Sequence, residues 1–202
     1  AEHRFDKVLS QLRAGDFVLI QFGHNDQKEK GEGVGAFTTY ATRLRDYIGA
    51  IQAKGGKPVL VTAVGRRRFD DKGQVTESLG DFPEAMRRVA KERGVPLVDL
   101  NTASKQVYQA LGVEKSKLAL LHIPAGTYPG QTTAIADNTH FSAYGAYEMA
   151  RCVVEGVRQG VPELAAFLAS DVTAFDPAHP DDPSKVVIVP SPYVKGEKPE
   201  GK

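Results

Sequence analysis

The sequence contains only one cysteine, Cys152, and this scarcity narrows the chemistry open to the protein. A single thiol excludes a disulfide within the sequence and a zinc site built from cysteines. Cys152 lies beside Val153 and Val154 in a segment expected to be helical, so we interpret it as a buried, inert thiol. The histidine, aspartate and glutamate residues also lack the spacing of metal ligands. We therefore expect neither a metal nor any other cofactor.

An excess of charge is missing as well, because 26 basic side chains stand against 25 acidic ones. Such a balance gives no overall field that would attract nucleic acid or anionic lipid, so we expect no nucleic-acid partner. The longest apolar runs have the length of a strand, so we expect no membrane-spanning segment. No signal peptide is recognisable.

What is present is the composition of one globular domain. The chain has 202 residues, of which 41% are hydrophobic and 25% are charged. It is long enough for one well-buried domain and too short for two ordinary ones. We assign residues 1–170 to this domain and residues 171–202, which hold six of the twelve prolines, to a C-terminal tail. Within the tail, residues 186–189 could pair as an edge strand.

Short apolar runs alternate with amphipathic segments along the chain, which is typical of a doubly wound α/β fold with a parallel sheet. We expect Asp81 to cap one helix, with Glu84 completing a capping box, and Asn101 to cap the next. In the helix that begins after Ser142, we expect the inner face to carry Ala146, Ala150, Val153, Val154 and Val157. The expected strands are residues 17–22, 58–64 and 95–100, and the expected helices are residues 3–12, 37–51, 81–94, 101–112, 142–158 and 162–169.

The first expected strand raises a question about the start of the sequence. Residues 17–22 are nearly all apolar, the pattern of a central strand buried on both faces. A central strand without a neighbour on one side would expose an apolar edge. We therefore expect at least one strand of the complete fold to precede residue 1.

Two polar clusters carry the residues typical of a catalytic site. Asp137 and His140 are spaced so that the carboxylate can accept a hydrogen bond from the imidazole, which would leave the second ring nitrogen as a general base. Alternatively, they are ordinary residues ahead of a helix that Ser142 caps, because Asp-x-x-His alone is a weak motif.

The other cluster follows the first expected strand at Gly23, His24, Asn25 and Asp26. In open α/β sheets, ligands bind at the carboxyl ends of strands. The Asn25 amide there is suited to donate to a developing oxyanion, and Gly23 would let the chain turn. A simple polar turn is the competing interpretation.

With both clusters in place, the sequence resembles the SGNH, or GDSL-type, hydrolases. Among these it is most similar to the carbohydrate esterases that include rhamnogalacturonan acetylesterase. The resemblance covers most of the chain and includes the strings RFDKVLSQLRAGDFVLIQFGHNDQ, VLVTAVGRRRF, GDFPEAMRRVA, VPLVDL and DNTHFSAYGA. It implies a three-layer α/β/α sandwich with a flavodoxin-like parallel sheet. It also implies that Asn25 is an oxyanion donor, His140 the general base and acid, and Asp137 its orienting partner, with Gly23 and His24 supporting the site.

The sequence departs from this family in two respects. No Gly-Asp-Ser motif with the nucleophilic serine is present, and the block that supplies a backbone N–H to the oxyanion hole has no counterpart before Gly23. Ser142 is better interpreted as a helix cap, and there is no Gly-x-Ser-x-Gly elbow. We expect both missing blocks to lie upstream of residue 1, so this chain alone should be inactive.

Further residues are candidates for substrate binding. Arg66 and Arg67 leave the second expected strand at the same sheet edge as Asn25, and guanidinium groups would suit the carboxylates of a uronate polymer. His122 lies in a long segment, residues 121–136, that could form a wall of the cleft together with Tyr128. Solvated loops are the ordinary alternative for both groups.

Together with the two clusters, the resemblance implies a serine-type esterase that removes acetyl groups from a pectic polysaccharide or oligosaccharide. By resemblance it would be secreted or periplasmic; its oligomeric state is left open. A catalytically inactive carbohydrate-binding protein is the first alternative. A dinucleotide-binding enzyme is the second, because residues 31–36 match Gly-x-Gly-x-x-Ala. These glycines begin eight residues beyond Gly23, whereas the dinucleotide motif lies in the turn directly after the strand.

Overall fold

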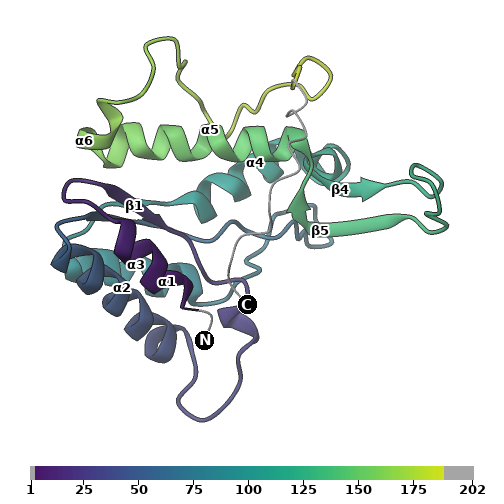
Figure 1. Ribbon diagram of the computed structural model, residues 1–202. Coiled ribbons are helices and arrows are strands. Elements are labelled where there is room, and N and C mark those ends of the chain that lie inside the picture. The colour runs from purple at the N-terminus through teal and green to yellow at the C-terminus, as the bar shows by residue number, and fades with distance from the viewer. Residues whose placement is uncertain (1–2, 189–202) are drawn as a thin grey trace.

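The computed structural model describes residues 3–188, which form three layers (Figure 1). A parallel sheet of β1, β2 and β3 lies between α1, α2 and α3 on one side and α4 and α5 on the other. This is the predicted α/β/α sandwich. The helices are α1 (Arg4–Gln11), α2 (Ala41–Ala53), α3 (Phe82–Arg93), α4 (Leu100–Lys115), α5 (Ala143–Gly160) and α6 (Pro162–Ala165), with the short helical segments η1 (Asp26–Lys28), η2 (Ala36–Tyr40) and η3 (Ser116–Ala119). The strands are β1 (Phe17–Ile20), β2 (Lys57–Val61), β3 (Leu97–Val98), β4 (Leu120–Ile123) and β5 (Ile135–Phe141).

Strand β2 is the centre of the sheet and divides the core in two. It pairs in parallel with β1 on one side and with β3 on the other. Because side chains alternate along a strand, Leu60 packs with the core against α2 and α3. Val59 and Val61 pack with the core against α4 and α5. All three side chains are buried, so the unbroken apolar sequence of β2 reflects a strand covered on both faces.

Strand β1 differs from the prediction of a central strand buried on both faces. Among residues 3–188 it pairs only with β2 and forms an edge of the sheet. Leu19 is 44% exposed, whereas Ile20 is buried. The apolar run therefore predicted the strand and its direction correctly, whereas a central position, with a further strand on the open side, stays a prediction.

Of the two predicted helix caps, one is right in position only and the other is wrong. Asp81 is the N-cap residue of α3, but its side chain makes no capping hydrogen bond, and Glu84 pairs with Arg88 one turn later instead of completing a capping box. At α4 the cap is Asp99, which accepts from the backbone N–H of Thr102. Asn101 lies inside this helix, fully buried, and donates to the carbonyl of Ala63 over 3.1 Å. A buried acceptor on a neighbouring segment thus displaced Asn101 from the capping role.

The buried face of α5 is also rotated from the predicted one. Ala146 and Ala150 are exposed, whereas Glu148 and Cys152 are buried. Burial of the thiol agrees with the interpretation of Cys152, and it raises the pKa of Cys152 to about 12. Gly156 packs so closely on Val98 that an added Cβ would lie 2.5 Å from a methyl group of that valine. Close approach of the helix backbone to the Val98 side chain, which apolar periodicity does not encode, accompanies this choice of face.

Residues 120–141 form an antiparallel hairpin of β4 and β5 that projects from the three-layer body (Figure 1). We expected a long irregular segment here, with the Asp-x-x-His cluster in a loop ahead of α5. The structure instead places that cluster within β5. The segment lacked a strand signal because it is polar and mostly exposed.

Residues 171–188 of the tail return along α5. The Tyr144 hydroxyl donates to the Asp181 carbonyl over 2.7 Å, and Arg151 forms an ion pair with the Asp181 carboxylate. The edge strand expected at residues 186–189 is absent at residues 186–188, and Val189 lies outside the described residues. No helix within residues 3–188 combines the length and apolar character needed to cross a membrane.

Candidate active site

The segment after β1 carries the first cluster and is held by close packing. Gly23 is buried and has a φ of +139°, a conformation that residues with a Cβ rarely adopt. A Cβ at this position would lie 3.2 Å from the Cβ of Ala63. The hydroxyl of Tyr40 donates to the carbonyl of Phe22 over 2.9 Å. The turn out of β1 is therefore set by the core and needs a glycine.

Asn25 presents its amide to solvent from this turn. Its Oδ1 accepts from Lys28 Nζ at 3.1 Å, which fixes the orientation of the amide group. No acceptor within the described part of the chain lies at hydrogen-bond distance from Nδ2. The Nδ2 hydrogens are therefore free to donate to a substrate oxygen.

His24 lies next to this amide and is half-buried. Burial, followed by the nearby positive charge of Arg66, lowers the pKa of His24 below its usual value. Charges on Lys28 and His140 act in the same direction. A neutral His24 is suited to a supporting position.

The second cluster is a bulge in β5. Leu120 pairs with Phe141 and His122 pairs with Ala136, so residues 137–140 lie opposite Leu121 alone. In a regular strand, side chains three positions apart point to opposite faces. The bulge removes this restriction and brings Asp137 and His140 together.

Three hydrogen bonds converge on the Asp137 carboxylate. Oδ2 accepts from His140 Nδ1 at 2.6 Å, and Oδ1 accepts from the backbone N–H groups of Thr139 and His140 at 2.7 and 3.0 Å. These donors lower the pKa of Asp137 to about 2, so the carboxylate is charged at neutral pH. With Nδ1 occupied, the ring presents Nε2, and the side chain of His140 is 73% exposed. The predicted contact between the two residues is present, and the ring has the arrangement of a general base.

The same contact occurs elsewhere in the chain without such surroundings. His179 Nδ1 and Asp176 Oδ2 lie 2.7 Å apart in the tail, and both side chains are largely exposed. An Asp-x-x-His pair is therefore not evidence of a site by itself. What distinguishes the pair in β5 is its location.

Consecutive arginines after β2 connect the two clusters. Arg66 Nη2 donates to the carbonyl of His24 over 3.2 Å, and the backbone N–H of Arg67 donates to the carbonyl of Asn138 over 2.9 Å. One segment leaving the carboxyl end of the central strand thus touches both clusters. They therefore lie at the same edge of the sheet, as the sequence predicted.

The side chains of the three candidate substrate-binding residues have partners within the protein. Arg66 also donates to Gln27 Oε1 and to the carbonyl of Ser78, at 2.7 and 3.1 Å. Arg67 Nη1 and His122 Nε2 both donate to Asn138 Oδ1, at 3.1 and 3.0 Å. Their roles in substrate binding remain predictions. Sequence reasoning missed Asn138, whose only signal was its place between the two candidate catalytic residues.

Other candidates take no part in this arrangement. The Ser142 hydroxyl donates to the carbonyl of Leu118 and accepts from the backbone N–H of Gly145, which is the predicted cap of α5. Residues 31–35, the glycine-rich segment, form a loop between η1 and η2 and not a turn directly after β1. Within residues 3–188, no group of three or more histidine, cysteine or acidic residues could hold a metal ion.

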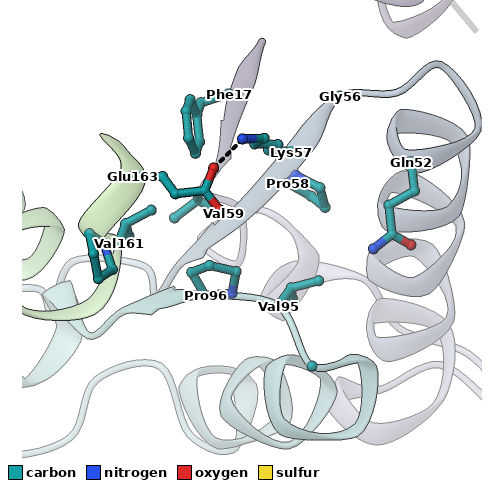
Figure 2. A pocket seen from close by; sticks show the side chains of 12 residues that line it. Phe17, Gln52, Gly56, Lys57, Pro58, Val59, Val95, Pro96, Val161 and Glu163 are labelled. Carbon is teal, nitrogen blue, oxygen red and sulfur yellow. Dashed lines mark hydrogen bonds and ion pairs between the residues drawn. The ribbon is translucent and has the colours of Figure 1, made fainter. Parts of the chain in front are cut away.

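A pocket at the opposite edge of the sheet is separate from this site. It lies where β1 and β2 begin, and Figure 2 shows the ion pair between Lys57 and Glu163 at its side. Its lining is formed mainly by apolar residues and glycines, without the candidate catalytic groups. The lining residues are Phe17, Gln52, Gly56, Lys57, Pro58, Val59, Gly94, Val95, Pro96, Val161, Pro162 and Glu163.

Comparison with known families and sequences gives a consistent result. Residues 1–147 match the GDSL-like lipase/acylhydrolase family. The chain is 41% identical over 162 residues to the rhamnogalacturonan acetylesterase RhgT of Bacillus subtilis (strain 168), covering 80% of this chain and 69% of that protein. It is 34% identical over 164 residues to the probable rhamnogalacturonan acetylesterase YesY of the same organism, covering 80% of this chain and 71% of that protein.

Solved structures share the fold. The crystal structure of protein YxiM from Bacillus subtilis aligns with a TM-score of 0.62 at 24% identity, covering 81% of this chain and 42% of that chain. The W215I variant of Axe2, an acetyl xylan esterase from Geobacillus stearothermophilus, aligns with a TM-score of 0.54 at 17% identity. That alignment covers 77% of this chain and 64% of the Axe2 chain. The chain thus spans less than two thirds of either structure, and at these identities the likeness concerns the fold alone.

Proposed function

Because the chain belongs to the GDSL-like lipase/acylhydrolase family, we propose that it forms most of a serine-type esterase that removes acetyl groups from a carbohydrate. The relatives named as rhamnogalacturonan acetylesterases support a pectic polysaccharide or its oligosaccharides as the substrate. We also propose that the nucleophilic serine is supplied by residues outside this sequence, which contains no Gly-Asp-Ser motif. In this proposal residues 1–170 belong to the catalytic domain and residues 171–202 to its tail.

In the proposed reaction, the serine Oγ attacks the acetyl carbonyl carbon while its proton passes to His140 Nε2. The Asn25 amide donates to the oxyanion that forms. The bond between the carbonyl carbon and the sugar oxygen then breaks, and His140 returns the proton to that oxygen. Water, deprotonated by the same Nε2, attacks the acyl-enzyme and releases acetate. Asp137 holds the imidazole in the required tautomer and stabilises its charged form.

One observation carries the proposal: His140 Nε2 is exposed at the sheet edge that also presents the free amide of Asn25, while its Nδ1 is held by a charged carboxylate. The aspartate contact alone would not favour catalysis, because His179 has the same one, but only His140 shares its sheet edge with the Asn25 amide. The catalytic interpretation is therefore favoured over the non-catalytic one.

The decisive test replaces His140 with alanine in a protein that carries both this sequence and the proposed serine. We expect cleavage of p-nitrophenyl acetate and release of acetate from acetylated rhamnogalacturonan to be lost. His179→Ala is the matched control, because it removes a histidine with the same aspartate contact from the tail and should leave both activities unchanged. Equal turnover by the two variants would exclude His140 from the mechanism.

A further inference from the structure

Asn138 lies in the centre of the bulge and is held from two sides. Its Oδ1 accepts hydrogen bonds from Arg67 Nη1 at 3.1 Å and from His122 Nε2 at 3.0 Å. Since a guanidinium can only donate, the atom facing it must be the amide oxygen. The Asn138 carbonyl accepts a further bond from the Arg67 backbone N–H at 2.9 Å. Arg67 therefore donates hydrogen bonds to both the side chain and the main chain of Asn138.

Arg67 is in turn anchored to the end of α4. Its Nε donates to Ser116 Oγ at 2.8 Å, and its Nη2 donates to the carbonyl of Val113. Ser116 is fully buried, and the guanidinium lies 5.2 Å from the centre of the Phe69 ring. Every nitrogen of this guanidinium thus binds a protein acceptor, which argues against the expected role in binding substrate.

The bulge needs such an anchor because packing does not hold it. Its four residues lie opposite the single residue Leu121, so regular strand pairing is interrupted there. Asn138 and His140 are exposed. Outside the bulge itself, Arg67 and His122 are the residues whose hydrogen bonds to it are described.

We propose that Arg67 is a positioning residue, which acts together with His122 through the Oδ1 of Asn138 to hold the Asp137–His140 pair in its working geometry. Its effect on catalysis rests on the proposed function, whereas its effect on the geometry does not. A guanidinium with three anchored nitrogens suits this role because its donors are fixed in one plane.

Two substitutions of Asn138 separate positioning from substrate contact. Asn138→Asp keeps an oxygen for Arg67 and His122 but removes the amide hydrogens, whereas Asn138→Ala removes both. If Oδ1 positions the bulge, Asn138→Ala lowers kcat about 100-fold with KM nearly unchanged, because displacement by about 1 Å can cost this much. Asn138→Asp then stays within about threefold of the wild type. Equal loss in both variants, or a loss confined to KM, would overturn the proposal.

Arg67→Ala should reproduce the kcat loss of Asn138→Ala, and the double variant should lose no more than either single one, because both remove the same link. Arg68→Ala is the matched control: this neighbour is exposed and makes none of these contacts. Additive losses in the double variant would contradict a shared link. If Arg67→Ala fails to fold, the comparison of Asn138→Asp with Asn138→Ala still tests the positioning role.

A second test, which does not depend on activity, measures the proton NMR resonance of the Nδ1–H of His140 in the same protein. Hydrogen-bonded to a carboxylate, this proton resonates far downfield, and it is observed at low temperature where exchange with water is slowed. We expect the resonance to be present in wild type and Asn138→Asp, and to be lost or broadened in Asn138→Ala and Arg67→Ala. If wild type shows the resonance but cleaves no acetyl ester, the proposed function fails while the positioning is still tested. If the resonance persists in every variant, the positioning role fails.

Discussion

The two candidate catalytic groups are held in place by different means. Asn25 follows a turn whose glycine is buried against Ala63, so packing in the core determines where its amide lies. His140 lies on an exposed bulge of a hairpin, where its carboxylate partner and the link from Arg67 to Asn138 determine its orientation. One half of the site is therefore coupled to folding and the other to a local hydrogen-bond network.

This difference predicts how the two halves respond to substitution. Changes on the hairpin side should reduce activity while leaving the free energy of unfolding almost unchanged, because exposed hydrogen bonds contribute little net stability. Changes at the turn after β1 should reduce both quantities, since buried close packing tolerates little added volume.

The largest effect expected within this comparison comes from Asp137→Asn. The Asn oxygen can still accept from the backbone N–H groups of Thr139 and His140, but its amide would donate to Nδ1 and place the proton on Nε2. The general base would then be lost, and kcat should fall about 10⁴-fold. The unfolding free energy from urea denaturation should change by less than about 1 kcal/mol. If Asp137→Asn lost much stability and kept activity, the hairpin side would be coupled to folding and not to a local hydrogen-bond network.

An intermediate effect is expected from Gly23→Ala. The new Cβ would meet Ala63 at 3.2 Å on a backbone with φ +139°, so we expect about 1–3 kcal/mol of lost stability together with reduced kcat. Gly33→Ala is the control, because its φ of +71° also disfavours a side chain but no atom lies within 4 Å of the added Cβ. Equal Tm changes in the two variants would show that packing at Gly23 does not matter.

The smallest effect concerns the buried face of the helix that follows the bulge. Burial, followed by repulsion from Asp181, raises the pKa of Glu148 to about 7, while Arg151 acts in the opposite direction. Neither carboxyl oxygen accepts a hydrogen bond of normal geometry within the described residues, although the nearby backbone N–H of Asp181 also acts to lower the pKa. Between its usual pKa near 4.5 and about 7, the folded state binds more protons than the unfolded state, so stability falls as pH rises through this window.

Glu148→Gln should therefore raise Tm by roughly 5 °C at pH 8 and have little effect at pH 4. Thermal unfolding followed by circular dichroism at both pH values measures this. Asp137 should show the opposite dependence, because its lowered pKa means that its contact with His140 is kept at neutral pH and lost only as pH falls toward about 2. A Tm gain of equal size at pH 4 and pH 8 would mean that removal of a buried charge is not the cause.

Residues close together in sequence were the most predictable part of the fold. The amphipathic pattern of α3 gave this helix within one residue at each end, the apolar run of β2 gave the strand within one residue at its start and three at its end, and Ser142 was correctly identified as a cap. Errors occurred where a distant partner competes with the local pattern. Asn101 does not cap α4, because its buried side chain donates to the carbonyl of Ala63. The buried face of α5 is the one that brings Gly156 close to Val98.

By itself the sequence determined the order of the three parallel strands and of the helices around them, and the two polar clusters at one edge of that sheet, but not the β4–β5 hairpin. These follow from the period of the apolar residues and from the rule that carboxyl ends of parallel strands share an edge. Only the tertiary structure decided that Asp137 and His140 meet on a strand bulge, and that Arg67 reaches Asn138 from 71 positions away. A hydrogen bond depends on where two atoms lie in space, and for residues this far apart the position is fixed by the packing of the whole chain.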